Sequence, residues 1–461
     1  MSHYLFEEFS PVSPAAWKQK IQVDLKGLDY NETLLHTSSE GIVIKPFYTS
    51  EDRSDSKITV PQKGFNICQS IFIDDEHIAN TLAKDALKRG ANAIQFIANR
   101  KFDYKQVLQN IEIENTLIYF KLQFLDTSFI VELSEHSTSN NIYFQLDIVG
   151  NLARTGNWYT NLQEDFSKLE EVVQKVDNAI MVDLSLYQNA GANIVQQLAY
   201  TLAHANEYLN KFSEVSARNI HFTFSVGSNY FFEIAKIRAF RLLWDSLVSA
   251  YGISNVTPHI FTQPSIRNKT LYDYNVNMLR TTSESMSAIL GSSDTVSNIT
   301  YDALYHKSNE FGERISRNQL LILQQESYLA EAQDFAEGAY YIEKITSQLA
   351  EKSLDLLKKI EKKGGFLKLL KEGTIQKKIN ESANKEQEKF NSKEIVLLGS
   401  NVLPNDKDSM KDDLEIYPFL KKKHIKTLIS PILIKRLSES YESERLNLEN
   451  NRIDEPKPEK N

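Results

Sequence analysis

The stretch from Asn178 to Leu209, NAIMVDLSLYQNAGANIVQQLAYTLAHANEYL, passes from a short apolar run through a polar turn into a long helical pattern. Residues 179–184 are almost continuously apolar apart from Asp183, which is typical of a strand buried on both faces of a parallel sheet. The apolar residues that follow recur at three-to-four-residue spacing and predict a helix packed back on the sheet: Ile194, Leu198, Leu202, Ala205 and Leu209. The loop at residues 185–189 is therefore expected at the carboxyl end of a strand, where parallel α/β folds carry ligands.

The same alternation of strand and helix patterns continues over residues 64–335. Helices are expected at residues 76–89 and 231–251, ended by Gly90 and Gly252. The expected strands are residues 66–73, 92–97, 116–124, 143–149, 179–184, 220–225, 257–262 and 297–303. A further strand at residues 129–133 is expected to form a hairpin with residues 116–124. About eight βα steps without a dinucleotide fingerprint favour a closed (β/α)8 TIM barrel over a doubly wound sheet.

Both ends of the chain differ in character from this central region. Residues 1–60 carry aromatic side chains, among them Phe6, Phe9 and Trp17, between polar turns, so this extended arm must lie against the barrel or a partner. From residue 341 the chain is predicted to be a helical extension, with a helix at residues 342–370 and a last amphipathic helix that begins at Pro431. The apolar face of that last helix would hold Ile434, Leu437, Tyr441 and Leu448. Residues 455–461 have the composition of a disordered tail. The expected division is thus an arm at 1–60, a barrel at 61–340 and an extension with a polar tail at 341–461.

Composition excludes several classes of function. The net charge of −8 and the pI near 5.7 argue against nucleic acid as the main partner, because phosphate binding requires a basic face. Lysine runs at residues 358–363 and 421–423 are interpreted as solvated surfaces. The single cysteine, Cys68, excludes an internal disulfide, and with the lack of an apolar leader it predicts a cytoplasmic protein. No stretch approaches about 18 continuous apolar residues, so no membrane span is expected.

Few residues have the spacing of a known catalytic, nucleotide-binding or metal-binding motif. There is no metal-ligand spacing, P-loop or Gly-x-Ser-x-Gly motif, so no metal site is predicted. His204 and His221 are interpreted as surface or barrel-wall residues, and Cys68 as a core residue. If the barrel has a pocket with chemistry of its own, the candidates near the strand ends are Asp183, Tyr187 and Arg267.

The loop after residue 183 resembles one in a known family. Residues 184–192 read LSLYQNAGA, and the methylmalonyl-CoA mutase family reads approximately Gly-Tyr-His-Met-Gln-Glu-Ala-Gly-Ala at its corresponding strand-to-helix turn. The frame residues that match are Gln188, Ala190, Gly191 and Ala192. Further matches follow in chain order at residues 41–49, 147–156, 231–244, 280–282, 314–318, 323–327 and 337–343. The resemblance implies a TIM barrel with an N-terminal arm across a subunit interface.

Several residues depart from the pattern of the family's catalytic subunits. The family's Tyr and His fall on Ser185 and Leu186, and a leucine can neither donate nor accept a proton. The family's Gln-Thr-Ser-Gly-Trp-Ser is replaced by residues 263–268, of which only Gln263 and Ser265 match. The family's Thr-Ile-Arg-Gln-Tyr-Ala-Gly-Phe motif has no counterpart before Asn66. The resemblance thus implies no catalytic residue in this chain, but a degenerate pocket with these family positions: Ser185, Leu186, Gln188, Gln263 and Ser265.

The resemblance also bears on the cofactor. In the family, a C-terminal flavodoxin-like domain supplies an Asp-x-His-x-x-Gly loop to the cobalt of cobalamin, whereas the only histidine here beyond residue 400 is His424, with no acidic residue two positions before it. No cobalamin-binding domain is therefore expected, and adenosylcobalamin is expected on a large subunit. The implied role is a non-catalytic small subunit that stabilises the large subunit of a heterodimeric mutase interconverting methylmalonyl-CoA and succinyl-CoA in propionate metabolism. The alternative is a TIM-barrel enzyme or acyl-CoA-binding protein with a repurposed pocket.

Overall fold

The computed structural model describes residues 7–53, 57–61, 64–136, 140–420 and 426–451. Eight parallel strands form one sheet in the order β6-β5-β4-β3-β10-β9-β8-β7. Their bounds are β3 (Asn66–Phe72), β4 (Ala93–Ala98), β5 (Leu117–Leu122), β6 (Ile142–Phe144), β7 (Ile180–Asp183), β8 (Ile220–Val226), β9 (Ile260–Pro264) and β10 (Thr295–Ser297). A parallel bridge between Leu146 and Ile180 joins the two edges of the sheet. The predicted (β/α)8 barrel is therefore confirmed.

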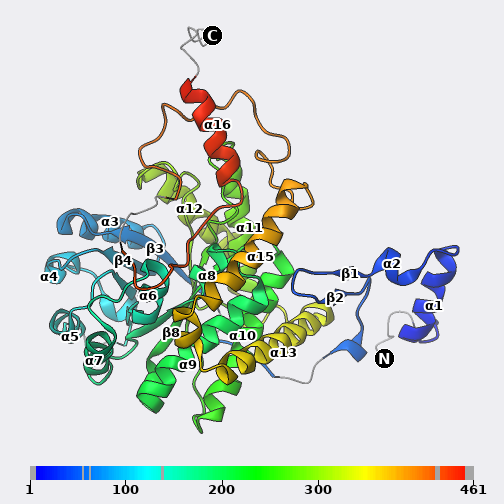
Figure 1. Cartoon of the computed structure of the whole chain (residues 1–461), viewed down its shortest axis with the longest axis horizontal. Helices are drawn as coiled ribbons and strands as arrows, with labels where there is room; N and C mark the ends of the chain where they lie inside the picture. The colour runs from blue at the N-terminus through cyan, green and yellow to red at the C-terminus, as the bar shows by residue number, and fades with distance from the viewer. Residues whose placement is uncertain (1–6, 54–56, 62–63, 137–139, 421–425, 452–461) are drawn as a thin grey trace.

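Helices surround the barrel (Figure 1). The principal ones are α3 (Glu76–Lys88), α5 (Thr127–Glu135), α7 (Leu162–Val173), α9 (Ile194–Asn219), α10 (Tyr230–Ala250), α11 (Val276–Leu290) and α12 (Glu310–Leu321). Shorter elements are α4 (Tyr104–Val107), α6 (Ile148–Thr155), α8 (Ser185–Asn189), η2 (Ile113–Asn115) and η3 (Ile322–Glu326). The apolar faces of strands and helices meet in one large core, where Phe222 of β8 packs on Phe240 and Trp244 of α10 at ring-centroid distances of 4.5 and 4.8 Å.

Four expectations about elements of the barrel are wrong. Residues 129–133 belong to helix α5 and not to a hairpin strand, because the Asp126 carboxylate caps the helix by accepting from the Phe129 N–H at 3.0 Å. A five-residue apolar run fits either period, and the cap settles which one forms. The expected strand at 143–149 ends at Phe144, since Asp147 caps α6 by accepting from Gly150 N–H at 2.7 Å. The last strand covers only Thr295–Ser297, and the predicted loop after Asp183 is the short helix α8.

The N-terminal segment extends from one side of the barrel (Figure 1). It contains α1 (Pro14–Asp24), α2 (Tyr30–Leu34), the antiparallel pair β1 (His36–Thr37) and β2 (Val43–Ile44), and η1 (Ser50–Asp52). Helix α1 buries none of its residues, and Trp17 stacks on Phe47 with ring centroids 5.4 Å apart. Contact with the body includes Ile42, which is buried in the main core, and Tyr48, whose ring lies 5.1 Å from that of Tyr341. Phe6 of the predicted aromatic set lies outside the described residues.

The C-terminal part packs helices on α9 and α10. Here the predicted helix 342–370 is two helices, α13 (Tyr340–Lys362) and α14 (Phe366–Lys371), separated by Gly364 and Gly365 with φ of +106° and +88°. Helix α15 (Thr374–Asn391) follows, and α16 (Glu439–Asn451) ends the described chain. The last helix therefore begins at Glu439, not at Pro431, and residues 431–438 before it form neither helix nor strand. Residues 421–425, with the second lysine run and His424, and the tail 455–461 lie outside the described residues.

Candidate functional site

The interior of the barrel is filled by side chains from successive strands. A polar layer runs across it: the Ser70 hydroxyl donates to Gln95 Oε1 at 2.7 Å and lies 3.0 Å from Ser297 Oγ. Gln95 Nε2 donates to Gln145 Oε1 at 2.6 Å, and Gln145 Nε2 donates to Thr223 Oγ1 at 3.4 Å. These partners satisfy one another in the middle of the barrel, as a packed core requires.

An aromatic layer lies nearer the amino ends of the strands. The Tyr119 hydroxyl is 2.7 Å from both His259 Nε2 and Thr295 Oγ1, and the Tyr119 ring meets Phe261 of β9. His221 Nε2 donates to the Phe144 carbonyl at 3.1 Å, and burial, with the neighbouring His259, lowers the pKa of His221 to about 3. Cys68 is buried in this layer, as predicted for a core residue, and burial raises the pKa of its thiol.

The segment after β7 contains Ser185 and Leu186, on which the resemblance puts the family's Tyr and His. Ser185 turns back on the strand: its N–H donates to Asp183 Oδ1 at 2.9 Å, and its hydroxyl donates to the same oxygen. Leu186 is 2% exposed and packs in the main core.

Gln188 belongs to a buried charged network that the sequence pattern does not reveal. Its Nε2 donates to Glu233 Oε1 at 2.9 Å, and its Oε1 accepts from Lys236 Nζ at 2.9 Å. Lys236 also forms an ion pair with Glu233 and donates to the Ser225 carbonyl at 2.6 Å. Glu233 and Lys236 thus pair across one helical turn, and the matched frame residue Gln188 joins α8 to α10.

The residues after β9 are joined to α8 in a similar way. Asn189 Oδ1 accepts from the Ser265 hydroxyl at 2.7 Å and from the Ile266 N–H at 3.2 Å. Gln263, in β9, is partly buried. Arg267 Nε lies 2.6 Å from Glu386 Oε2 of α15, so its charge is neutralised by the C-terminal extension. Ser265 and Arg267 thus connect elements of the fold.

His204 and His221, both interpreted from the sequence as surface or barrel-wall residues, lie in different parts of the protein, and Tyr187 contacts His204. Tyr187 is buried, and its hydroxyl lies 2.9 Å from His204 Nδ1, while His204 Nε2 lies 2.9 Å from Asp147 Oδ1. Burial opposes the charge on Asp147, but His204 and the Tyr208 hydroxyl hold the pKa of this carboxyl below its ordinary value. His204 also stacks on Phe366 of α14, with centroids 5.4 Å apart and planes at 4°. His204 therefore lies in the core between barrel and extension, whereas His221 faces the barrel interior.

A segment without helix or strand, residues 428–438, crosses the carboxyl end of the barrel, and we call it the strap. Figure 1 shows the chain before α16 passing beside α6 and α8. Backbone hydrogen bonds fix the strap to the loops that follow β6, β7 and β9: Leu428 N and Ile429 N to Gly156 O, Ile432 N to Ala153 O, Lys435 N to Asn189 O, and Leu437 N to Arg267 O, at 2.7–3.1 Å. Gly156 has φ +81°, and a Cβ there would lie 2.6 Å from Ile429 O, so a glycine is required for this approach.

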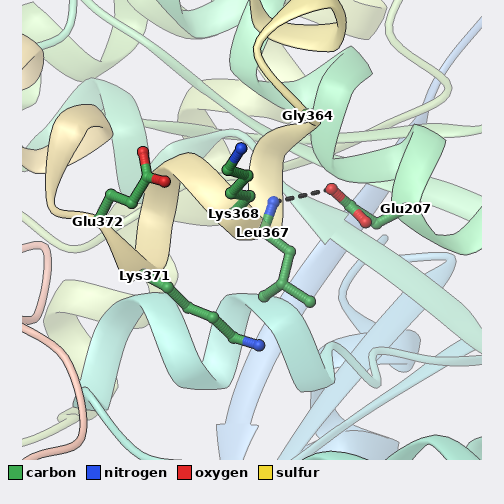
Figure 2. Close-up of a pocket in the computed structure, with 6 residues that line it drawn as sticks. All are labelled: Glu207, Gly364, Leu367, Lys368, Lys371 and Glu372. Carbon is green, nitrogen blue, oxygen red and sulfur yellow. Dashed lines mark hydrogen bonds between the residues drawn. The ribbon is translucent and has the colours of Figure 1, made fainter.

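A surface cavity of about 480 Å³ lies elsewhere, between α9 and α14 (Figure 2). Lys368, Lys371, Glu207 and Glu372 line it, and Glu207 Oε1 accepts from the Leu367 N–H at 2.8 Å. None of the predicted pocket positions lines this cavity. In the part of the chain that the structure describes, no group of His, Cys, Asp and Glu is arranged to hold a metal ion, and no helix is long and apolar enough to cross a membrane.

Comparison with known proteins identifies the family to which the chain belongs. A family model for methylmalonyl-CoA mutase matches residues 135–444. The chain is 31% identical over 442 residues to the methylmalonyl-CoA mutase small subunit of Porphyromonas gingivalis, covering 87% of this chain and 71% of that subunit. It is 32% identical over 248 residues to the large subunit of the same organism and 36% identical over 236 residues to the methylmalonyl-CoA mutase of Cereibacter sphaeroides. These two alignments cover only 35% and 33% of those longer proteins. The chain belongs to the methylmalonyl-CoA mutase family and is a homologue of its small subunit.

Proposed function

We propose that this chain is a non-catalytic small subunit of an adenosylcobalamin-dependent methylmalonyl-CoA mutase, and that it binds and stabilises the catalytic large subunit. The observation that carries the proposal is the state of the loop after β7. The position of the family's histidine is Leu186, buried in the core, and the position of its tyrosine is Ser185, bound to Asp183. A side chain without an ionisable group cannot transfer a proton, and loss of a positioned acid or base costs roughly 10²–10⁴-fold in rate.

The alternative, a barrel with chemistry of its own, is disfavoured for two of its three candidate residues, Tyr187 and Arg267. Tyr187 is bound to His204 in the core, and Arg267 is paired with Glu386 and donates to the Lys435 carbonyl at 2.7 Å. Both are used to attach the extension and the strap to the barrel. Their contacts are those of structural residues.

The N-terminal segment supports the proposed partner. Val12, Val23 and Leu28 are 68%, 70% and 65% exposed, and Trp17 is 55% exposed. Obligate subunit interfaces commonly bury more than about 2,000 Å² and are more apolar than transient ones. We assign residues 1–60 to the interface with the large subunit, residues 61–340 to the barrel and residues 341–461 to the extension that covers it.

The isolated chain is expected not to bind cobalamin. The family's axial-ligand motif is missing, and His424 has no acidic residue two positions before it. Gel filtration of the purified chain with hydroxocobalamin, followed by visible absorbance, measures this. The large subunit under the same conditions is the positive control, and cobalamin absorbance that elutes with the isolated small subunit would contradict the assignment of the cofactor to the large subunit.

Restoring the missing side chain is expected not to restore activity. Leu186→His would place an imidazole in a core position that is 2% exposed, without the family's tyrosine or a bound cofactor. Succinyl-CoA formation by the variant alone, with adenosylcobalamin added, should stay at the level of the unchanged chain. Leu186→Met, which keeps an apolar side chain of similar volume, controls for the effect on folding. Measurable turnover by the histidine variant alone would show that the chain holds the remaining catalytic groups.

A further inference from the structure

Aromatic side chains in contact with one another lead from the N-terminal segment onto the body of the protein. In the segment, Trp17 stacks on Phe47 with ring centroids 5.4 Å apart. The next residue along the chain, Tyr48, has its ring 5.1 Å from that of Tyr341 in α13, and the Tyr341 ring lies 5.6 Å from that of Phe231 in α10. We call these five residues the aromatic row. They come from distant parts of the sequence, so only the tertiary structure brings them together.

The body end of the aromatic row is exposed. Phe231 is 49% exposed, whereas Phe232, the next residue of α10, is 2% exposed and packs in the main core. The start of this helix is held in place, because Glu233 Oε1 accepts from the Gly227 N–H at 2.9 Å. Tyr340, the first residue of α13, is 37% exposed. The body therefore presents aromatic surface where the N-terminal segment joins it.

The junction between the segment and the body is fixed by several contacts (Figure 1). Ile42 is buried in the main core. Arg53 Nε lies 3.3 Å from Glu343 Oε2 of α13, and Lys45 pairs with Asp52 inside the segment. The aromatic row is therefore held in place where it passes from the segment to the body, and a protein that binds the segment lies close to the exposed rings of α10 and α13.

The size of a stable interface also requires more surface than the helices of the segment supply. A standard interface takes roughly 20–30 residues from each side, and obligate ones are larger. Helices α1 and α2 have only 11 and 5 residues. Single exposed apolar side chains are ordinary, but a contiguous apolar patch marks an interaction site. The exposed rings beside the junction are such a continuation of the segment's surface.

We propose that Phe231 and Tyr340 are contacted by the large subunit, so that one continuous interface runs from the N-terminal segment onto α10 and α13. This inference rests on the proposed function and adds to it the part of the body that the partner covers. The large subunit is the expected occupant because the chain is a homologue of a mutase small subunit and the row continues the surface assigned to that partner. Aromatic residues are enriched in the cores of interfaces, where their truncation costs most binding energy.

The first test measures binding of the full chain to the immobilised large subunit by surface plasmon resonance. Phe231→Ser should weaken the affinity by roughly 10- to 100-fold, the usual effect of truncating a central aromatic residue. Tyr340→Ser should act in the same direction. The matched control is Phe311→Ser, which should leave the affinity unchanged. Phe311 is the second residue of α12 and 50% exposed, as Phe231 is the second residue of α10 and 49% exposed.

The second test locates the contact directly. The only cysteine, Cys68, is buried, so a cysteine introduced on the surface is the one thiol open to rapid alkylation. With saturating large subunit, alkylation of Phe231→Cys by iodoacetamide should slow in proportion to the fraction of chain bound. Alkylation of Phe311→Cys should keep its rate.

The outcomes separate this inference from the proposed function. Circular dichroism establishes that each variant is folded, and Tyr340→Ser with the alkylation rates decides the matter if Phe231→Ser is not. An unchanged chain that fails to bind the large subunit contradicts the proposed function and this inference with it. An unchanged chain that binds, while the variants at 231 and 311 behave alike in both tests, overturns this inference alone. Protection at 231 without the large subunit, rising with the concentration of the chain itself, would assign the surface to a second copy and also overturn it.

Discussion

A chain lacking residues 1–45 is expected to lose co-purification with the large subunit almost completely, whereas a chain lacking residues 450–461 should co-purify as well as the full chain. The physical reason is the exposed apolar surface of the N-terminal segment. Helix α1 has no buried residue, and its Trp17 is covered on one side only, by Phe47. A surface of this kind is stable in water only when a partner covers it.

The measurement is co-expression of a tagged large subunit with each truncated chain, followed by quantification of the two bands. The deletion at the other end is the control for the effect of shortening the chain, since residues 450–461 are almost all polar. Expressed alone, the full chain should self-associate, and removal of residues 1–45 should reduce this. Undiminished recovery of the truncated chain with the large subunit would place the interface elsewhere on the molecule.

Lys236→Met should cost about 3–5 kcal/mol in the free energy of unfolding, the usual effect of removing one partner from a buried ion pair. The Lys236 side chain is fully buried and that of Glu233 is 4% exposed. Burial lowers the pKa of Lys236, and Glu233 opposes this. The substitution leaves the Glu233 carboxylate in the core without its cation and removes donors from Gln188 and the Ser225 carbonyl.

Urea denaturation followed by circular dichroism measures this loss. The matched control is Lys168→Met, which breaks an exposed pair on α7 with Lys168 Nζ 2.8 Å from Glu164 Oε1 and should cost less than about 0.5 kcal/mol. The double variant Glu233→Gln with Lys236→Met should recover part of the loss, because the unpaired charge is then removed. Equal effects of the two lysine substitutions would mean that the Glu233–Lys236 network does not stabilise the fold.

The local spacing of apolar residues was sufficient to predict the barrel as a whole. The apolar run at 179–184 became β7, and the three-to-four-residue spacing after it became α9, because a side chain's period along the chain reports which face of an element is buried. Ser185 and Leu186 could also be identified from the sequence, since the frame residues around them match a known loop. Where local signals were balanced, as in residues 129–133, the period was ambiguous and a single cap at Asp126 determined the helix.

The surroundings of the site could not be read from the sequence, because they are made by residues far apart in it. Gln188 meets Glu233 and Lys236 from 45 and 48 positions away, and Asp147 meets His204 across 57. Residues 431–438 have apolar spacing that also suits a helix, yet they form none, because N–H groups of this segment bind the carbonyls of Ala153, Asn189 and Arg267. A backbone hydrogen bond to a distant segment does not depend on the side chains, so it produces no periodic pattern in the sequence. The sequence by itself thus determined the barrel, because the side-chain period is local, and only the tertiary structure decided that the strap crosses the carboxyl end, because its backbone hydrogen bonds join residues far apart in the chain.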